Sequence, residues 1–321
     1  MNLLRTLKDF VPYRVNYSVE QFPDLTGKVY IVTGASGGLG LQVGKKLLQK
    51  NAKVYFVAKT EPKLVAAIEK LKEEFPDKTE NIHYLLCDYG DLSTIKPATD
   101  KFLAENDRLD GIVHNAGMNF AGPDSKTAQG HELTVGVNGI APHLFQKYVD
   151  EILEKTAQTA PANSVRIVWV SSSAHRLSPV GNGGLQLDDM NNVADGLLKL
   201  GRYSHSKTVN YYQGVLWPIF HKGSKVISVS VHPGLVGTDI GRNVGMDSNS
   251  ILHTISYTPE KASYAELYPL LHPSITTSDN GNFYVPFGQA EHPRQDVFDG
   301  AHGEFGLKVW AWLEEQVKDF V

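Results

Sequence analysis

The sequence predicts an α/β fold: a doubly wound, Rossmann-like sheet of about seven parallel strands, with helices on both faces, in a single domain. Short apolar runs rich in β-branched residues alternate with longer segments whose apolar residues recur at helical spacing. The apolar runs are continuous, which is typical of strands that are covered on both faces. Repeated strand–helix–strand units with right-handed crossovers then favour a doubly wound parallel sheet.

Seven apolar runs are expected to form the strands. They lie at residues 28–33, 53–58, 82–87, 111–114, 165–170, 225–231 and about 281–285. Amphipathic segments separate them, and in residues 62–75 one helical face is formed by Leu64, Ala67, Ile68 and Leu71. A last helix is expected near residues 303–320, with an apolar stripe formed by Leu307, Trp310, Leu313 and Val317.

Composition and charge describe an ordinary globular protein. Of the 321 residues, 41% are hydrophobic and 21% are charged, which is ample material for a core. The formal net charge of -4 gives no basic field for phosphate polymers or anionic lipids, so we expect no nucleic acid partner. The single cysteine, Cys87, excludes an internal disulfide, and the histidines lack metal-ligand spacing, so we expect no metal.

The chain is expected to fold as one domain. No Pro- or Ser-rich linker divides it, and no apolar run approaches the roughly 18 residues that a membrane-spanning helix needs. We expect residues 25–321 to form this domain and residues 1–24 to form an N-terminal extension. The basic and apolar residues of the extension suit a helix packed on the domain of a cytoplasmic protein, with a mitochondrial presequence or a membrane-touching helix as alternatives.

A glycine-rich turn follows the first strand. Residues 33–40 read TGASGGLG, and a helical pattern begins directly after them. Glycines here allow the backbone to approach a pyrophosphate, whose charge the amides and dipole of a helix N-terminus attract. A glycine triplet alone also fits a flexible turn, but the strand before it and the helix after it favour a dinucleotide site.

The TGxxxGxG spacing resembles that of the short-chain dehydrogenase/reductase family, whose further motifs follow in order from about Leu25 onward. Asp88 matches the aspartate that hydrogen-bonds the adenine ring, and Asn115 opens an Asn-Ala-Gly motif that steadies the sheet beside the cofactor. A Pro-Gly-Leu-Val-Gly-Thr stretch matches the segment that contacts the nicotinamide and phosphates. The resemblance thus implies cofactor contacts at Gly34, Ser36, Gly38, Leu39, Gly40, Asp88, Asn115, Pro233, Gly234, Val236 and Thr238.

The end of the second strand favours NADP(H), with NAD(H) as the alternative. NAD-specific sites usually place an Asp or Glu there to bind the ribose hydroxyls, whereas this chain has Lys59 followed by Thr60. A cation and a hydroxyl suit a 2′-phosphate, which a carboxylate repels. Many NADP-dependent relatives carry Arg here, and some add a basic residue where this chain has Gly37, so a solvated surface lysine remains the other interpretation of Lys59.

Tyr203 and Lys207 are the expected centre of the chemistry. Positions i and i+4 of a helix share a face, and an ammonium beside a phenol favours the phenolate. Two other tyrosine–lysine pairs have this spacing, but the pair at 55 and 59 lies on a strand and the pair at 257 and 261 encloses a proline. The pair at 203 and 207 follows the fifth strand, at whose carboxyl end open α/β sheets bind ligands.

The family resemblance assigns roles to four side chains. Tyr203 exchanges a proton with the substrate oxygen, and Lys207 tunes this phenol and holds the nicotinamide ribose, so both also contact the cofactor. Ser172 matches the serine that hydrogen-bonds the substrate oxygen. Asn138 matches the asparagine that maintains a water chain to the lysine, although a single Asn on a helix is commonly a packing or kink residue.

These residues predict an NADP(H)-dependent carbonyl reductase or alcohol dehydrogenase. The long interval between Ser172 and Tyr203 resembles the retinol dehydrogenase-like branch, which handles lipophilic aldehydes, ketones and alcohols. We expect substrate loops near residues 174–200 and 240–271, the second forming a lid. Family members commonly form homodimers or homotetramers, so either assembly is possible here.

Two rival functions remain open. The chain can be a non-catalytic NADP-binding protein that senses redox state, although the intact tyrosine and lysine argue against it. It can also belong to the epimerases and dehydratases of the extended family branch. Those proteins usually show TGxxGxxG and a larger C-terminal domain, which this sequence lacks.

Overall fold

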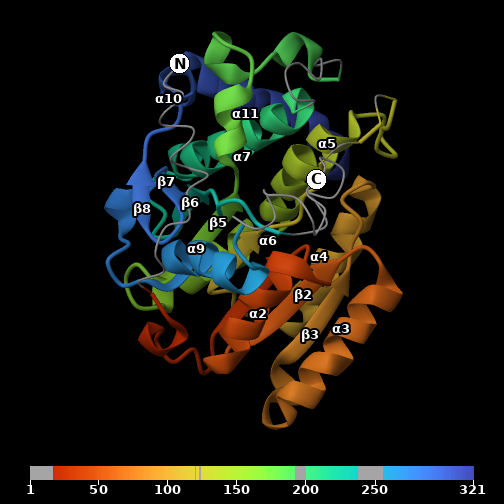
Figure 1. Cartoon of the computed structure of the whole chain (residues 1–321), viewed down its shortest axis with the longest axis vertical. Coiled ribbons are helices and arrows are strands. Elements are labelled where there is room, and N and C mark those ends of the chain that lie inside the picture. The colour runs from red at the N-terminus through yellow and green to blue at the C-terminus, as the bar shows by residue number, and fades with distance from the viewer. Residues whose placement is uncertain (1–16, 120, 123, 192–199, 238–255) are drawn as a thin grey trace.

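In the part of the chain that the structure describes, eight strands form one sheet in the order β3-β2-β1-β4-β5-β6-β7-β8 (Figure 1). The computed structural model describes residues 17–119, 121–122, 124–191, 200–237 and 256–321. Strands β3 through β7 pair with parallel neighbours, and β7 pairs with β8 in antiparallel register. The predicted Rossmann-like, doubly wound sheet of seven parallel strands is therefore confirmed, with one antiparallel strand added at its edge.

The strands match the predicted apolar runs closely. Their bounds are β1 (Val29–Thr33), β2 (Lys53–Ala58), β3 (Ile82–Leu86), β4 (Gly111–His114), β5 (Arg166–Val170), β6 (Ile227–Val231), β7 (Phe283–Val285) and β8 (Gln289–Glu291). Every residue of β1, β5 and β6 is buried, as expected for a sheet covered on both faces. Strand β8 was not predicted, because its three residues are polar or small and lie at the solvent-facing sheet edge.

Two helical layers cover the sheet (Figure 1). Helices α4 (Ile95–Glu105), α6 (Ala141–Thr159), α7 (Gly201–Phe220) and α11 (Glu304–Val317) share one buried cluster with Ile31 of β1. Helices α2 (Gly38–Gln49), α3 (Glu61–Glu74) and α9 (Pro259–Leu271) share another with Val32. Neighbouring residues of a strand point to opposite faces, so β1 to β5 and β7 each contribute to both clusters, whereas β6 contributes only to the second. The short helices are α5 (Leu133–Val135) and α10 (Gln295–His302).

The C-terminal helix uses a different face from the predicted one. Trp310, Leu313 and Val317 are buried as expected, but the side chain of Leu307 is 51% exposed. Val309, which is fully buried, completes the face instead. The position of α11 against α7 decides this: Phe305 and Gly306 of the same turn pack against Tyr212 and Leu216 of α7, whereas Leu307 faces away from them.

The described part of the N-terminal extension belongs to the core. Tyr17 and Phe22 are 5% and 3% exposed, and their ring centroids lie 4.7 Å apart. The Tyr17 ring also lies against Tyr268 of α9, at 5.2 Å. The domain therefore begins before residue 25, while the helix expected in the extension falls mostly on residues 1–16, outside the described residues.

The two predicted substrate loops differ in character. Residues 174–191 run through short 3-10 turns, beginning with Ser173–Leu177 directly after β5. Of the segment at 240–271, residues 240–255 lie outside the described residues. Its last part is α9, which packs on α2 and β5 and supplies buried side chains to the core. Residues 259–271 therefore do not belong to the predicted lid. Among the described residues, no helix is both long enough and apolar enough to cross a membrane.

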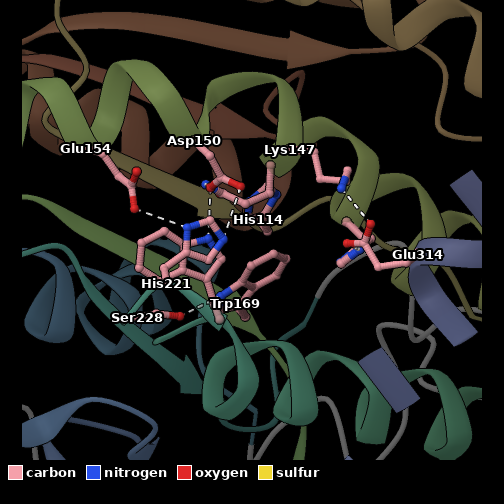
Figure 2. A network of polar contacts seen from close by, with 11 residues as sticks. His114, Lys147, Asp150, Glu154, Trp169, His221, Ser228 and Glu314 are labelled. Carbon is pink, nitrogen blue, oxygen red and sulfur yellow. Dashed lines mark hydrogen bonds and ion pairs between the residues drawn. The ribbon is translucent and has the colours of Figure 1, made fainter. Parts of the chain in front are cut away.

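A buried polar network joins α6 to the end of β4 and to the end of α7 (Figure 2). His114 bonds Gln146 at 2.8 Å, whose amide donates to Asp150 at 2.6 Å. The ring of His221 lies 3.6 Å from Asp150 and 3.1 Å from Glu154. Burial lowers the pKa of His114 to about 4, so its ring is neutral at pH 7 and serves packing.

Candidate functional site

The glycine turn lies where β1 and β4 separate, at the topological switch point of the sheet. Gly34 and Gly38 have φ values of +67° and +56°, which glycine adopts without strain. A Cβ on Gly40 would lie 2.5 Å from Asn115 Nδ2 and 2.8 Å from Gly34 O. The turn therefore requires glycine at these positions, and the first amides of α2 lie directly behind it.

Asn115 holds the glycine turn in place from the next strand. Its side-chain amide donates to the carbonyl of Thr33 at 2.8 Å and to that of Gly34 at 3.3 Å. The amide of Ala116 donates to the hydroxyl of Thr33 at 2.9 Å. These bonds join the ends of β1 and β4, so the Asn-Ala-Gly motif fixes the turn on which a dinucleotide would lie.

The remaining motif residues lie around the same edge. Asp88 follows β3 and accepts a hydrogen bond from the amide of Gly90 at 2.8 Å. Gly234, with φ of +89°, leaves room for the Tyr257 ring, 2.7 Å from where its Cβ would be. Val236 packs with Leu39 and Tyr257, so the segment that begins at Pro233 reaches the glycine turn. Thr238 lies outside the described residues.

A second lysine accompanies Lys59 beside the glycine turn. Lys59 is exposed at the end of β2, before α3 begins at Glu61. Lys63, in the first turn of α3, extends to Gly37: a Cβ there would lie 3.5 Å from Lys63 Cε and 3.6 Å from Nζ. Sequence reasoning missed Lys63, although its position four residues after Lys59 is a signal that a second cation is near.

Tyr203 and Lys207 lie on one face of α7, beside the carboxyl end of β5. The Nζ atom of Lys207 is 5.8 Å from the centroid of the Tyr203 ring. The Ser172 hydroxyl acts on the Tyr203 phenol and lowers its pKa, and it accepts a hydrogen bond from the amide of Ala174 at 3.1 Å. Ser171 turns inward, and its hydroxyl donates to the carbonyl of Lys207 at 2.6 Å.

Burial controls the ionisation of this pair. It raises the pKa of Tyr203, and the hydrogen bond from Ser172 opposes that shift only in part. Burial also lowers the pKa of Lys207 to about 8, against the attraction of the Glu266 carboxylate. The sequence led us to expect a depressed phenol pKa beside an ammonium. Here desolvation of the phenol raises its pKa instead, so Tyr203 holds its proton at neutral pH.

Asn138 is fully buried in a π-helical turn, Gly136–Ile140, just before α6. Its side chain accepts from the amide of Met118 at 2.8 Å and donates to the hydroxyl of Ser206 at 2.9 Å. Ser206 is next to Lys207 on α7. The side chain of Asn138 therefore joins three segments. Its main-chain carbonyl faces α7, where it accepts a hydrogen bond from Asn210.

Glu266 is an ionisable group that sequence reasoning missed. It is fully buried on α9, and neither carboxylate oxygen has a hydrogen-bond partner among the described residues. Burial raises the pKa of Glu266 to about 8, against the attraction of Lys207. A lone glutamate between Ala265 and Leu267 in an apolar helix was the signal in the sequence that could have identified it.

No metal-binding cluster of His, Cys, Asp or Glu occurs in the part of the chain that the structure describes.

Comparisons with known proteins show sequence similarity to the short-chain dehydrogenases. The sequence model of the short chain dehydrogenases matches residues 28–181. A short-chain dehydrogenase/reductase of Phomopsis amygdali is 37% identical over 97% of this chain and 95% of its own length. Another, from Neocamarosporium betae, is 34% identical over 97% of this chain and 92% of its own.

Solved structures share the fold at lower sequence identity. The NADPH-bound carbonyl reductase from chicken fatty liver has a TM-score of 0.64 at 20% identity, covering 85% of this chain and 96% of that one. At that identity the likeness concerns the fold alone. The two fungal relatives, aligned over nearly the full length, carry the assignment further: the chain belongs to the short-chain dehydrogenase/reductase family, whose members are oxidoreductases that bind nicotinamide cofactors.

Proposed function

We propose that the protein is an NADP(H)-dependent carbonyl reductase or alcohol dehydrogenase. The observation that carries the proposal is the meeting of Tyr203, Ser172 and Lys207 at the carboxyl end of β5, on the edge where the glycine turn lies. A phenol that keeps its proton, a hydroxyl that bonds it and a nearby ammonium form an acid–base site for a C=O or CH–OH group.

The glycine turn fits a dinucleotide. A Cβ on Gly34 or Gly40 would clash with Ala116 or Asn115, and Gly38 has a φ of +56°, so the backbone turns tightly and without side chains at these positions, next to the N-terminus of α2. The residues that would hold the cofactor are those of this turn together with Asp88, Asn115, Pro233, Gly234, Val236 and the pair Tyr203 and Lys207. When bound, the nicotinamide supplies or accepts the hydride.

Two lysines support NADP(H) over NAD(H). Lys59 follows β2 and Lys63 lies in the first turn of α3, near the place where the adenosine ribose of a dinucleotide would be held. Their charges suit a 2′-phosphate, and the Thr60 hydroxyl adds a donor between them. Glu61 carries the opposite charge in the same turn of α3, so the preference depends on the lysines outweighing it.

The residues of this chain divide the proton chemistry between them. In the direction of reduction, Tyr203 donates its proton to the substrate oxygen, which its raised pKa allows at neutral pH. The Ser172 hydroxyl stabilises the charge that develops on that oxygen. The ammonium of Lys207 stabilises the phenolate that remains and holds the ribose. In the direction of oxidation, the same groups act in reverse order.

We propose a lipophilic or aromatic aldehyde, ketone or alcohol as substrate. The support is the long loop after Ser172, which resembles that of the retinol dehydrogenase-like branch, together with the mixed apolar sequence of residues 240–255. Residues 174–191, between Ser172 and Tyr203 in the sequence, start at the site and are anchored by Arg294, which donates to the carbonyls of Arg176 and Ser178.

Turnover of a panel of aldehydes and ketones with NADPH and with NADH tests the proposal. We expect absorbance loss with NADPH in the wild type, near-complete loss of turnover in Tyr203→Phe, and unchanged turnover in Tyr84→Phe, a matched change on β3. NADPH binding, followed by fluorescence, should persist in Tyr203→Phe. A wild type that binds NADPH but reduces no carbonyl would favour the redox-sensing regulator instead.

A further inference from the structure

Four polar side chains follow one another along the face of α7 that carries the candidate site. Tyr203, Lys207 and Asn210 have the spacing i, i+4 and i+7, and Gln213 lies three residues further. Asn210 and Gln213 are 2% and 0% exposed. The last two residues have no place in the proposed proton transfer, so their burial needs a separate explanation.

Asn210 joins Lys207 to the turn before α6. Its Oδ1 accepts from Lys207 Nζ at 3.1 Å, and its Nδ2 donates to the main-chain carbonyl of Asn138 at 2.6 Å. The second hydrogen of Nδ2 is used by Gln213 Oε1 at 3.0 Å, and Gln213 in turn donates to the carbonyl of Gly139 at 2.7 Å. The amide of Asn210 is thus held from three sides in one orientation.

The sequence around Asn138 leaves this carbonyl available. In a regular helix the carbonyl of residue 138 accepts from the amide of residue 142, but residue 142 is a proline and has no N–H. The π-helical turn at Gly136–Ile140 precedes it. A buried carbonyl without a partner is costly, and the Asn210 amide supplies the missing donor.

The three N–H groups of Lys207 can then be assigned. One donates to the carbonyl of Val170 at 2.7 Å and a second to Asn210 at 3.1 Å. A lysine ammonium has three donors, so one is left, on the side where Gly117 and Tyr203 lie. A Cβ on Gly117 would lie 3.4 Å from Lys207 Nζ, so the glycine keeps that side open.

We propose that Asn210 is a positioning residue: by bridging Lys207 to the carbonyl of Asn138, it holds the ammonium charged and directs its third N–H toward Tyr203 and the ribose. The family resemblance implies that a chain of water molecules connects the asparagine to the lysine. Here the side-chain amide of Asn210 makes the connection between Asn138 and Lys207. The inference rests on the proposed function for its consequence, but the bridge itself is testable without turnover.

Few groups act on the charge of the Lys207 ammonium. Burial disfavours the ammonium, and Glu266 of α9 is the ionisable side chain whose charge acts on it. Tyr203 lies beside it on α7, while β5 and the turn before α6 present carbonyls. A change of one acceptor, Asn210 Oδ1, should therefore move the protonation equilibrium of Lys207 measurably.

The test compares two substitutions with opposite electrostatic effects. Asn210→Leu removes the acceptor and should move the titration of Lys207 down by about one pH unit, whereas Asn210→Asp adds a negative charge and should move it up by a similar amount. The titration is followed by NMR on protein with isotope-labelled lysine side chains. The Lys207 signal is assigned by its loss in Lys207→Met.

A matched control separates charge from packing. Gln213→Leu disturbs the same buried cluster but leaves the contacts of Asn210 with Lys207 and with the carbonyl of Asn138, so the Lys207 titration should stay within a few tenths of a pH unit. Circular dichroism and thermal unfolding verify that each variant is folded. If Asn210→Leu proves unfolded, Asn210→Asp against the control still decides. Shifts in the same direction for both Asn210 variants, or no shift in either, would overturn the proposal.

Kinetic measurements then test whether the titration of Lys207 controls carbonyl reduction. The alkaline limb of kcat/KM for carbonyl reduction should follow the Lys207 titration, to lower pH in Asn210→Leu and to higher pH in Asn210→Asp. If the NMR titrations shift as expected while no variant and no wild type reduces a carbonyl, the bridge is established and the proposed function is wrong.

Discussion

The ammonium nitrogen of Lys207 lies 5.8 Å from the centre of the Tyr203 ring, with both side chains on the same face of α7. Burial lowers the pKa of Lys207 to about 8 and raises that of Tyr203. At neutral pH the lysine is therefore charged and the phenol protonated, which is the state that protonates a carbonyl oxygen.

Lys207→Met should abolish most of the activity while the fold persists. The methionine side chain has a similar length and no charge, so the phenolate formed at Tyr203 loses its stabilising partner. We expect kcat to fall by about 10²-fold or more, in line with the loss of a positioned acid–base group. Steady-state kinetics with NADPH measure it, and a variant with near wild-type kcat would contradict the assignment.

Lys63→Gln should weaken NADPH binding and leave NADH binding nearly unchanged. Removal of one of two cations near a 2′-phosphate is expected to raise the Kd for NADPH about tenfold, the cost of one charge-assisted hydrogen bond. Glu61→Gln should act in the opposite direction. The matched control is Lys70→Gln, about 10 Å further along α3, and an equal effect of Lys70 and Lys63 would show that only net charge matters.

Gly40→Ala should damage the dinucleotide cradle, whereas Gly37→Ala should be tolerated. A Cβ on Gly40 would lie 2.5 Å from Asn115 Nδ2, so the bonds between Asn115 and the turn must shift. At Gly37 the backbone is extended and a Cβ would meet only the flexible end of Lys63, at 3.5 Å. We expect Gly40→Ala to lose about 1–3 kcal/mol of stability and over tenfold in NADPH affinity, by denaturation and by fluorescence titration.

Glu266 should make the protein less stable as pH rises from about 5 to 8. Its pKa is about 8 in the fold, against an ordinary value of 4.5, so within that window the folded state binds a proton that the unfolded chain has released. The free energy of unfolding then falls with pH, by up to about 1.4 kcal/mol per pH unit. Lys207, whose pKa is lowered to about 8, contributes the opposite slope above pH 8.

Glu266→Gln tests this directly. The glutamine has the same shape and does not ionise, so urea denaturation across the window should show a flatter pH dependence than in the wild type, with a gain in stability near pH 8. An unchanged slope would mean that Glu266 is ionised throughout. Glu260→Gln on the exposed side of α9 is the control and should leave the slope as it is.

Arg294→Met should loosen the loop that follows Ser172. The guanidinium donates to the carbonyls of Arg176, Ser178 and Pro179 at 3.0, 2.6 and 2.5 Å. Without it those carbonyls lose their donor, so we expect a loss of about 1–3 kcal/mol together with a several-fold higher KM for the substrate. Arg108→Met, which breaks an ion pair at the opposite end of the sheet, should lower stability without changing KM.

The tertiary structure also corrects and extends the sequence interpretation at particular residues. The helix of residues 259–271 was expected to be part of a lid, because its apolar side chains resemble the lining of a pocket; packing against α2 and the sheet buries them instead. Leu307 was expected in the core because its spacing fits a stripe, but α11 turns it outward. Whether an apolar side chain meets the core or the solvent depends on a partner that is distant in the chain.

By itself the sequence determined what is local or periodic. Continuous apolar runs produce strands buried on both faces, the spacing of Gly34, Gly38 and Gly40 produces a tight turn, and the i, i+4 spacing of Tyr203 and Lys207 places both on one helix face. The contacts between groups from different segments depend on the tertiary structure. Lys63 reaches the glycine turn, Asn210 donates to the carbonyl that Pro142 leaves without its helical donor, and Glu266 interacts electrostatically with Lys207. These contacts depend on how the helices pack against the sheet, so the spacing of residues along the chain does not predict them.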